Sequence, residues 1–311
     1  MSGDKKVMQK KKLIYSFLFL LAGGTALTVF FYGYFLDISG VYTPARAEYE
    51  QVSARPEKPV VYIGVISRYP PNIIYRGYQP MLEYLTANTP YHFELKLSTD
   101  YNEAVQMLVK GETAAAFLGS YVYIKAREKY RVIPILKPLN ENYQPYSRSV
   151  LITHKSSGLK ELKDLKGKRL ALPSQESFSG NWLISYELGR QGIKVSDIAE
   201  IQHFPHHQSV IYQVASRYFD AGVTREFLVN SLQNRDSIRI ILYSEKIPTS
   251  PLVAAVGYDQ NIINAISAAL LMLNRSNQNL TQITRNWDSE FKYGFEKAND
   301  SDYDFIRLIE R

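Results

Sequence analysis

Apolar residues in most of this chain come in short runs that alternate with longer stretches of helical periodicity. The runs Val60 to Ile66 and Ala114 to Leu118 are too short for typical helices and predict buried strands. Between them, residues 101–109 repeat their apolar positions at helical spacing, with Asp100 suited to the N-cap and Gly111 lying just beyond the end. Because such units recur along the chain, the pattern predicts an α/β fold with largely parallel sheets.

The predicted units fall into two sets that are separated near Tyr146. The first set has strands and helices at residues 60–66, 76–87, 93–98, 101–109, 114–118 and 121–129. The second set lies at residues 149–153, 169–172, 180–191, 200–204, 207–217, 219–223 and 225–233, followed by helices at 262–273, at 280–287 and after Asp300. We therefore expect a binding domain over residues 59–311, with lobe 1 at 59–146 and 250–311, lobe 2 at 149–244, and connections near 146–149 and 244–250. Open α/β sheets bind ligands beyond the carboxyl ends of their strands, so the cleft between the lobes is the predicted ligand site.

The stretch from Leu13 to Leu36 has no charged side chain in 24 residues. A helix needs about 20 apolar residues to cross the hydrocarbon core of a membrane, so this stretch predicts a single-pass transmembrane anchor. Five lysines lie within residues 1–12 and Asp37 follows the stretch, which predicts a cytoplasmic tail on one side. The binding domain would then lie in the periplasm or outside the cell, tethered to the inner (cytoplasmic) membrane.

Residues 37–58 are polar and contain Pro44 and Pro56, which is typical of a linker between an anchor and a folded domain. A cleaved signal peptide is the alternative to a retained anchor, because Ala45-Arg46-Ala47 resembles a cleavage site. The apolar stretch is longer than the apolar region of most signal peptides, which favours the anchor.

The net charge of +7 is concentrated at the N-terminus. Residues 1–12 carry five lysines and one aspartate, a local charge of +4, which leaves +3 for all the other residues. So small an excess gives no reason to expect nucleic acid as a partner. The chain has no cysteine, which excludes disulfides, thiolate catalysis and cysteine-based metal sites.

The stretch from Pro173 to Gly180, with the sequence PSQESFSG, joins a predicted strand to a predicted helix. Ser177 or Ser179 can be the N-cap of that helix, and unpaired N–H groups at a helix N-terminus favour an oxyanion. A glycine at position 180 would allow a ligand to approach the backbone closely. The simpler interpretation is that the serines only cap the helix.

Several segments resemble, in order, the phosphate, phosphite and phosphonate-binding protein family. These segments are TDYNEAVQMLVKGETAAAFLGSYVYI at 99–124, SVLITHKSSGLKELKDLKGKRLAL at 149–172 and HHQSVIYQVASRYFDAGVT at 206–224. Members of this family are substrate-binding components of ABC transporters with a type II periplasmic-binding-protein fold. The resemblance therefore implies a two-lobed α/β fold, behind the predicted transmembrane helix, that closes around a small oxyanion.

The resemblance implies seven ligand-binding residues, which are Ser177, Ser179, Gly180, His207, Ser120, Tyr69 and Glu226. By position, Ser177, Ser179 and the N–H groups near Gly180 would hold the oxyanion, and His207 would donate to it. In the first lobe Ser120, which follows Gly119, and Tyr69 would add donors. Glu226 matches an acidic residue that helps receive the amine in aminophosphonate binders.

Three positions depart from the pattern of the family. Phe178 replaces a hydroxyl residue between the two serines, and Leu118 stands where an aromatic donor is usual. Ser250 stands where aminophosphonate binders carry an aspartate toward the amine. These departures argue against 2-aminoethylphosphonate and favour a smaller or partly apolar anion.

His203, His206 and His207 could in principle bind a metal, but Pro205 breaks helical spacing among them and no fourth ligand is near in sequence. Motifs of the common hydrolases and nucleotide-binding enzymes are missing from the sequence. We therefore expect neither catalysis, cofactor nor metal, and a function in capturing an oxyanion for a membrane permease. The alternative is a ligand-sensing input or adaptor for a signalling protein in the same membrane.

Overall fold

The computed structural model describes residues 21–26, 58–232 and 237–310, and the chain divides into two compact units, Met1–Glu57 and Lys58–Arg311. In the first unit, residues 21–26 are helical. The predicted cytoplasmic tail at 1–12, most of the anchor at 13–36 and the linker as far as residue 57 lie outside the described residues. Within the described part of the chain, no helix has both the length and the apolar character needed to span a membrane.

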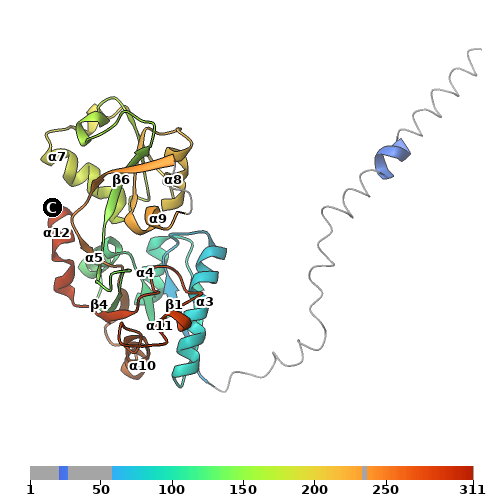
Figure 1. The fold of residues 1–311 in the computed structure, drawn as a ribbon. Helices are drawn as coiled ribbons and strands as arrows, with labels where there is room; N and C mark the ends of the chain where they lie inside the picture. The colour runs from blue at the N-terminus through green and yellow to red at the C-terminus, as the bar shows by residue number, and fades with distance from the viewer. Residues whose placement is uncertain (1–20, 27–57, 233–236, 311) are drawn as a thin grey trace, which may run out of the picture. The chain divides into compact units, whose positions relative to one another are not determined.

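The first lobe of the second unit is built on a six-stranded sheet, with strand order β13-β4-β12-β3-β1-β2. Its strands are β1 (Val60–Val65), β2 (His92–Leu97), β3 (Ala115–Phe117), β4 (Val132–Pro138), β12 (Leu252–Ala255) and β13 (Phe295–Lys297). Its helices are α3 (Pro71–Asn88), α4 (Tyr101–Val109), α5 (Ser120–Lys129), α10 (Gln260–Leu271), α11 (Leu280–Ile283) and α12 (Asp304–Glu310). Figure 1 shows this lobe below the second one, with α12 running up to the boundary between them.

The second lobe is built on a five-stranded sheet, with strand order β10-β6-β9-β7-β8. Its strands are β6 (Ser149–His154), β7 (Arg169–Leu172), β8 (Glu200–His203), β9 (Ala221–Arg225) and β10 (Ile238–Tyr243). Its helical segments are α6 (Phe178–Trp182), η3 (Leu183–Glu187), α7 (Leu188–Arg190), α8 (His207–Ala215) and α9 (Glu226–Asn230). Short 3-10 turns η2 (Leu162–Leu165) and η4 (Val195–Asp197) connect some of these elements.

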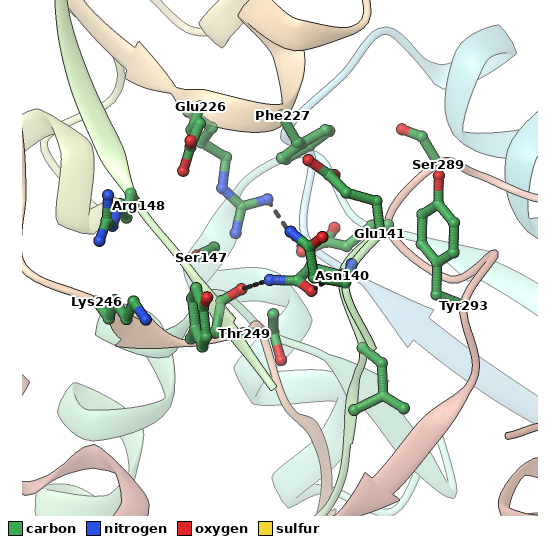
Figure 2. A pocket seen from close by; sticks show the side chains of 15 residues that line it. Asn140, Glu141, Ser147, Arg148, Glu226, Phe227, Lys246, Thr249, Ser289 and Tyr293 are labelled. Carbon is green, nitrogen blue, oxygen red and sulfur yellow. Dashed lines mark hydrogen bonds and ion pairs between the residues drawn. The ribbon is translucent and has the colours of Figure 1, made fainter. Parts of the chain in front are cut away.

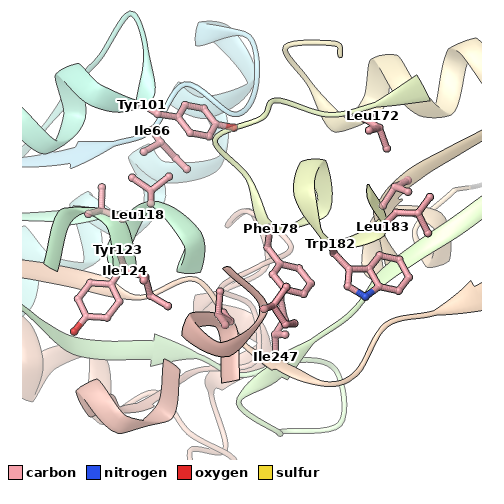
Figure 3. Packing of buried hydrophobic residues seen from close by; sticks show 14 of the residues in the cluster. Ile66, Tyr101, Leu118, Tyr123, Ile124, Leu172, Phe178, Trp182, Leu183 and Ile247 are labelled. Carbon is pink, nitrogen blue, oxygen red and sulfur yellow. The ribbon is translucent and has the colours of Figure 1, made fainter. Parts of the chain in front are cut away.

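The two lobes are joined by a pair of antiparallel strands, β5 (Tyr146–Ser147) and β11 (Ile247–Pro248). Beside this pair, one apolar cluster includes buried residues of both lobes and of the connection, among them Leu118, Phe178 and Ile247 (Figure 3). The lobes therefore pack against each other next to the chain segments that connect them.

The prediction of a two-lobed α/β fold is confirmed, but the prediction of largely parallel sheets is wrong. Strand β1 is parallel to β2 and β3, and β7 is parallel to β8 and β9. The remaining pairings within the two large sheets are antiparallel. The reason is that the chain crosses between the lobes twice, and the strands after each crossing enter their sheet in the opposite direction.

Candidate functional site

A cavity of about 40 Å³ lies between the lobes, beside the two connecting strands. We call it the interlobe cavity. It is lined by Ile66, Arg68, Tyr101, Gly119, Ser120, Ser147, Arg148, Ser149, Glu176, Ser177, Phe178, Ser179, His207, Arg225, Ile247 and Ser250. Four of the seven predicted site residues, Ser120, Ser177, Ser179 and His207, are therefore brought together in one place. The volume fits a ligand of a few heavy atoms better than a sugar or a peptide.

The serine-rich loop reaches the cavity as the N-terminus of helix α6. Ser177 is the N-cap, because its Oγ accepts a hydrogen bond from the N–H of Gly180 at 3.1 Å. The same hydroxyl donates to the carbonyl oxygen of Ser174 at 2.8 Å, so its proton is used within the loop. Ser179 is buried and shares a hydrogen bond of 2.6 Å with Ser149 of β6. Of the two predicted serines, Ser177 therefore holds the loop in shape and Ser179 presents a hydroxyl pair to the cavity.

Gly180 has a packing role that was not predicted from the sequence. A Cβ built at this position would lie 2.1 Å from the carbonyl oxygen of Ser174, and Gly180 is not among the lining residues. The space beside its backbone is filled by the loop itself, since residues 173–174 fold back against the helix. Glycine is thus required for close packing of the loop, and its role in the approach of a ligand stays a prediction.

The first-lobe helix α5 faces the cavity with its N-terminus. Gly119 and not Ser120 is the N-cap residue, and the buried hydroxyl of Ser120 donates to the carbonyl oxygen of Pro248 at 2.9 Å. This bond ties the helix to the connecting strand β11. Tyr101, at the start of α4, also lines the cavity, and burial raises the pKa of its phenol, which keeps the hydroxyl protonated.

Three arginines line the cavity, and the sequence analysis did not single out any of them. Arg68 lies just beyond β1, Arg225 is the last residue of β9, and Arg148 lies between β5 and β6. The first two follow the carboxyl ends of strands, where open α/β sheets place their ligand-binding residues. That rule was a usable signal in the sequence, but arginine is so common in surface loops that it did not distinguish these positions.

Three buried atoms of the lining residues have no hydrogen-bond partner. Among all buried side-chain nitrogen and oxygen atoms in the described residues, four lack a partner, and three of these are Arg68 Nε, Arg148 Nε and His207 Nδ1. Burial, followed by the charges of Arg225, Arg68 and His206, lowers the pKa of His207 well below its ordinary value, so the ring is neutral. The two arginine Nε atoms are donors, and His207 Nδ1 is one in the tautomer that carries its proton there. An unsatisfied buried donor costs about 1–3 kcal/mol, so this concentration in one place favours an acceptor with several oxygens.

Behind the cavity wall, a buried carboxylate joins two of the arginines. Glu290 Oε2 lies 2.5 Å from Arg68 Nη1, and Oε1 lies 3.0 Å from Arg225 Nη1. Ser250 Oγ accepts from Arg225 Nη2 at 2.8 Å. Burial alone would raise the pKa of Glu290, but the guanidinium groups of Arg225 and Arg68 lower it below its ordinary value. The carboxylate is therefore ionised.

The two remaining predicted residues line other cavities. Tyr69 is buried in the apolar core of lobe 1, and its side chain borders a separate pocket with His206. Glu226 lines a cavity of about 200 Å³ on the other side of Arg148 and Arg225, where Figure 2 shows it near Arg148. We call this second space the hinge cavity.

Phe178 and Leu118, which both depart from the family pattern, differ in whether they line the interlobe cavity. Phe178 lines the interlobe cavity and packs into the shared apolar cluster (Figure 3). Leu118 is fully buried within that cluster and is not among the lining residues. Of these two residues, only Phe178 therefore adds to the apolar part of the cavity wall, beside Ile66 and Ile247.

The three histidines near residue 205 have separate partners. His203 Nδ1 lies 2.7 Å from the carbonyl oxygen of Pro173, and His206 Nδ1 lies 3.2 Å from that of Arg68. His207 instead lines the interlobe cavity. Among the described residues, no group of three or more histidine, cysteine or acidic side chains is arranged to hold a metal ion.

A model of one protein family matches residues 63–303, and its description is ABC transporter, phosphonate, periplasmic substrate-binding protein. Binding proteins from Brucella abortus are 30% identical over 119 residues, which is 38% of this chain and 33% of the relative. The match thus spans about a third of the length of these curated relatives.

Two solved structures are similar in fold. One is a binding protein component of an ABC phosphonate transporter from Pseudomonas aeruginosa, with a TM-score of 0.70 and 19% identity over 82% of this chain and 86% of that one. The other is PhnD1 from Prochlorococcus marinus in complex with methylphosphonate, with a TM-score of 0.70 and 19% identity over 81% of this chain and 97% of that one. At this level of identity the likeness establishes the fold alone.

Proposed function

Because this chain belongs to the family of periplasmic substrate-binding proteins of phosphonate ABC transporters, we propose that it captures a small phosphonate-like oxyanion in the interlobe cavity. The observation that carries the proposal is the set of unsatisfied buried atoms on Arg68, Arg148 and His207, which all belong to lining residues of one cavity. A tetrahedral anion presents several acceptor oxygens, so it can satisfy donors from several directions at once. The family is one of transport components and not of enzymes, so no bond is made or broken.

The proposed ligand contacts come from both lobes and from their connection. Arg68 and Tyr101 approach from lobe 1, Ser179 and His207 from lobe 2, and Arg148 from the connecting segment. Guanidinium groups bind tetrahedral oxyanions strongly because their N–H groups match pairs of oxygens. Since the donors belong to two bodies, a bound anion would hold the lobes together.

The proposed ligand is small and lacks an amine. The hydroxyl of Ser250 accepts from Arg225, and Arg68 Nη1 lies 3.5 Å away, so an ammonium group at this position would meet two cations. The nearby carboxylate of Glu290 is already paired with both arginines. Methylphosphonate, which PhnD1 of Prochlorococcus marinus binds, is a suitable probe because it combines an oxyanion with one methyl group that Phe178 could contact.

We further propose that the chain delivers its ligand to a membrane permease and stays tethered to the inner membrane by residues 13–36. Family membership supports the permease and gives no support to the signalling alternative. The anchor rests on the sequence, through its uncharged length and the preceding lysines. Washing membranes with alkaline carbonate tests it, because a retained anchor keeps the full-length protein in the pellet and a cleaved leader releases a shorter one.

The binding proposal is tested by calorimetry of the full-length chain with phosphate, phosphite, methylphosphonate, 2-aminoethylphosphonate and sulfate. We expect binding of at least one amine-free anion and weaker binding of 2-aminoethylphosphonate. Arg148→Met should lower the affinity for the anion by about 10- to 100-fold, the usual effect of losing a hydrogen bond to a charged group.

Arg131→Met is the matched control, since it removes the same charge from an exposed side chain before β4. It should leave affinity nearly unchanged. Absence of heat and of any thermal shift with all five anions would overturn the proposal.

A further inference from the structure

We infer that Glu290 determines the ionic charge of the ligand that the interlobe cavity accepts. This inference rests on the proposed function, because it concerns the selectivity of the same site. Glu290 acts through Arg68 and Arg225, which line the cavity, and is therefore a specificity-determining residue that need not touch the ligand.

The geometry makes Glu290 a shared counter-ion. Each of its two carboxylate oxygens pairs with a different arginine, Oε2 with Arg68 Nη1 at 2.5 Å and Oε1 with Arg225 Nη1 at 3.0 Å. Its side chain is only 5% exposed, so the charge is poorly screened by water. Arg225 belongs to lobe 2, whereas Glu290 lies next to Phe291 in the core of lobe 1, so the ion pair also spans the lobes.

The charges around the cavity show what this carboxylate changes. Three arginines line the cavity and His207 is neutral. Glu176 also lines the cavity, and burial followed by the charge of Asp100 raises its pKa, but at alkaline pH it carries its negative charge. Glu290 differs from Glu176 in being paired directly with two of the arginines, and it cancels one of three positive charges.

The energetic consequence depends on the charge of the ligand. Repulsion between Glu290 and a bound anion grows in proportion to the charge of that anion. A dianion therefore loses twice as much binding free energy to Glu290 as a monoanion in the same position. Once Glu290 and Glu176 are both counted against the three arginines, one positive charge remains, which suits a small oxyanion and disfavours highly charged phosphate esters.

The test compares the wild-type full-length chain with Glu290→Gln by calorimetry, using methylphosphonate at alkaline pH as the dianion and methanesulfonate as the monoanion. The substitution keeps the shape of the side chain and removes its charge. We expect methylphosphonate to bind about tenfold more tightly and methanesulfonate about threefold more tightly, because the first factor is the square of the second. Glu290→Asp, which keeps the charge, should keep the selectivity of the wild type.

Asp302→Asn is the matched control. It removes a carboxylate from the ion pair with Lys137, which lies outside both cavities, and should change neither affinity. Equal tightening of both ligands by Glu290→Gln, or no tightening of methylphosphonate, would overturn the inference. If the wild type binds no oxyanion at all, the proposed function fails instead, so the two failures are distinguishable.

Removing Glu290 leaves two buried arginines without their counter-ion, which can destabilise the fold. Thermal unfolding with increasing methylphosphonate therefore provides a second measurement. The inference predicts that the ligand raises the melting temperature of Glu290→Gln by more than it raises that of the wild type. A smaller or equal rise in the variant contradicts it.

Discussion

At the scale of single residues, the glycine at the start of α6 offers the sharpest test of how the site is built. Gly180→Ala would place a methyl group 2.1 Å from the carbonyl oxygen of Ser174, so the loop must move away from the helix. We expect a loss of about 1–3 kcal/mol in the free energy of unfolding, which is typical of overpacking, and weaker anion binding because the loop carries Ser177 and Ser179. Denaturant unfolding and calorimetry measure the two effects.

Gly189→Ala is the control in the same helical segment. An added Cβ at position 189 meets no atom within 4 Å, so alanine should be tolerated there and should stabilise the helix by roughly 0.5–1 kcal/mol. Equal effects of the two substitutions would show that the contact with Ser174 does not restrict position 180.

The residues of the site differ in how far sequence could identify them. Ser177, Ser179 and His207 lie next to a helix start, and capping chemistry is visible within a few neighbouring positions. Arg68 and Arg225 are separated by most of the folded chain, and only the topology brings them to one cavity. Nothing in the neighbouring sequence distinguishes these two arginines from solvated surface arginines. Glu290 likewise cannot be distinguished from a surface glutamate by its neighbours.

The serines also show that the sequence can locate a loop without showing which hydroxyl groups are free to bind a ligand. The sequence placed Ser177 at the loop, but its hydroxyl is committed to Gly180 and Ser174. The fold of the loop decides which of the two nearby hydroxyls forms hydrogen bonds with the backbone. Three-dimensional packing determines that fold. The burial of Ser179 against Ser149 likewise depends on the neighbouring strand β6.

At the scale of elements, local sequence signals were sufficient to predict most of the helix starts that follow the parallel strands. Helix α4 begins at Tyr101, and Asp100 caps it by accepting from the N–H of Glu103 at 2.7 Å. Helix α3 begins earlier than expected, at Pro71, because proline is well suited to the first position of a helix. The first turn contains the buried Ile74, but the two prolines at 70 and 71 indicate a loop in the sequence.

Strand direction and the late strands could not be predicted in the same way. Strands β4, β10 and β12 are short apolar runs that were not predicted, and their pairing partners are distant in sequence. Burial of a strand is encoded in its own residues, but its direction is decided by where the chain re-enters the sheet. The segment Leu183–Glu187 adds a similar case, since it forms a π-helical turn between two α-helical parts. Such turns often accompany functional sites, and this one follows directly on the helix that presents Ser179.

At the scale of the whole binding domain, the contacts between lobes are of two kinds. The apolar cluster and the strands β5 and β11 join the lobes on one side. Polar contacts that span the lobes include the Arg225–Glu290 ion pair and the bond of His206 to the carbonyl oxygen of Arg68. When the lobes separate, water can hydrate the groups that make these polar contacts, whereas separating the apolar cluster would expose apolar surface, so we expect any opening to occur about the connecting strands.

Ligand binding should therefore narrow the distribution of distances between the lobes. The chain has no cysteine, so Lys129→Cys on α5 and Gln175→Cys on the serine-rich loop can carry spin labels without background. Both positions are exposed and border one groove of about 280 Å³ between the lobes. We expect methylphosphonate to shorten and sharpen the distance between these labels in pulsed electron spin resonance. A second pair within lobe 1, Lys129→Cys with Lys110→Cys, should give the same distance with and without ligand. If calorimetry reports binding while the first pair also stays unchanged, the donors of the two lobes are preorganised around the anion, and closure is not the signal that a permease would detect.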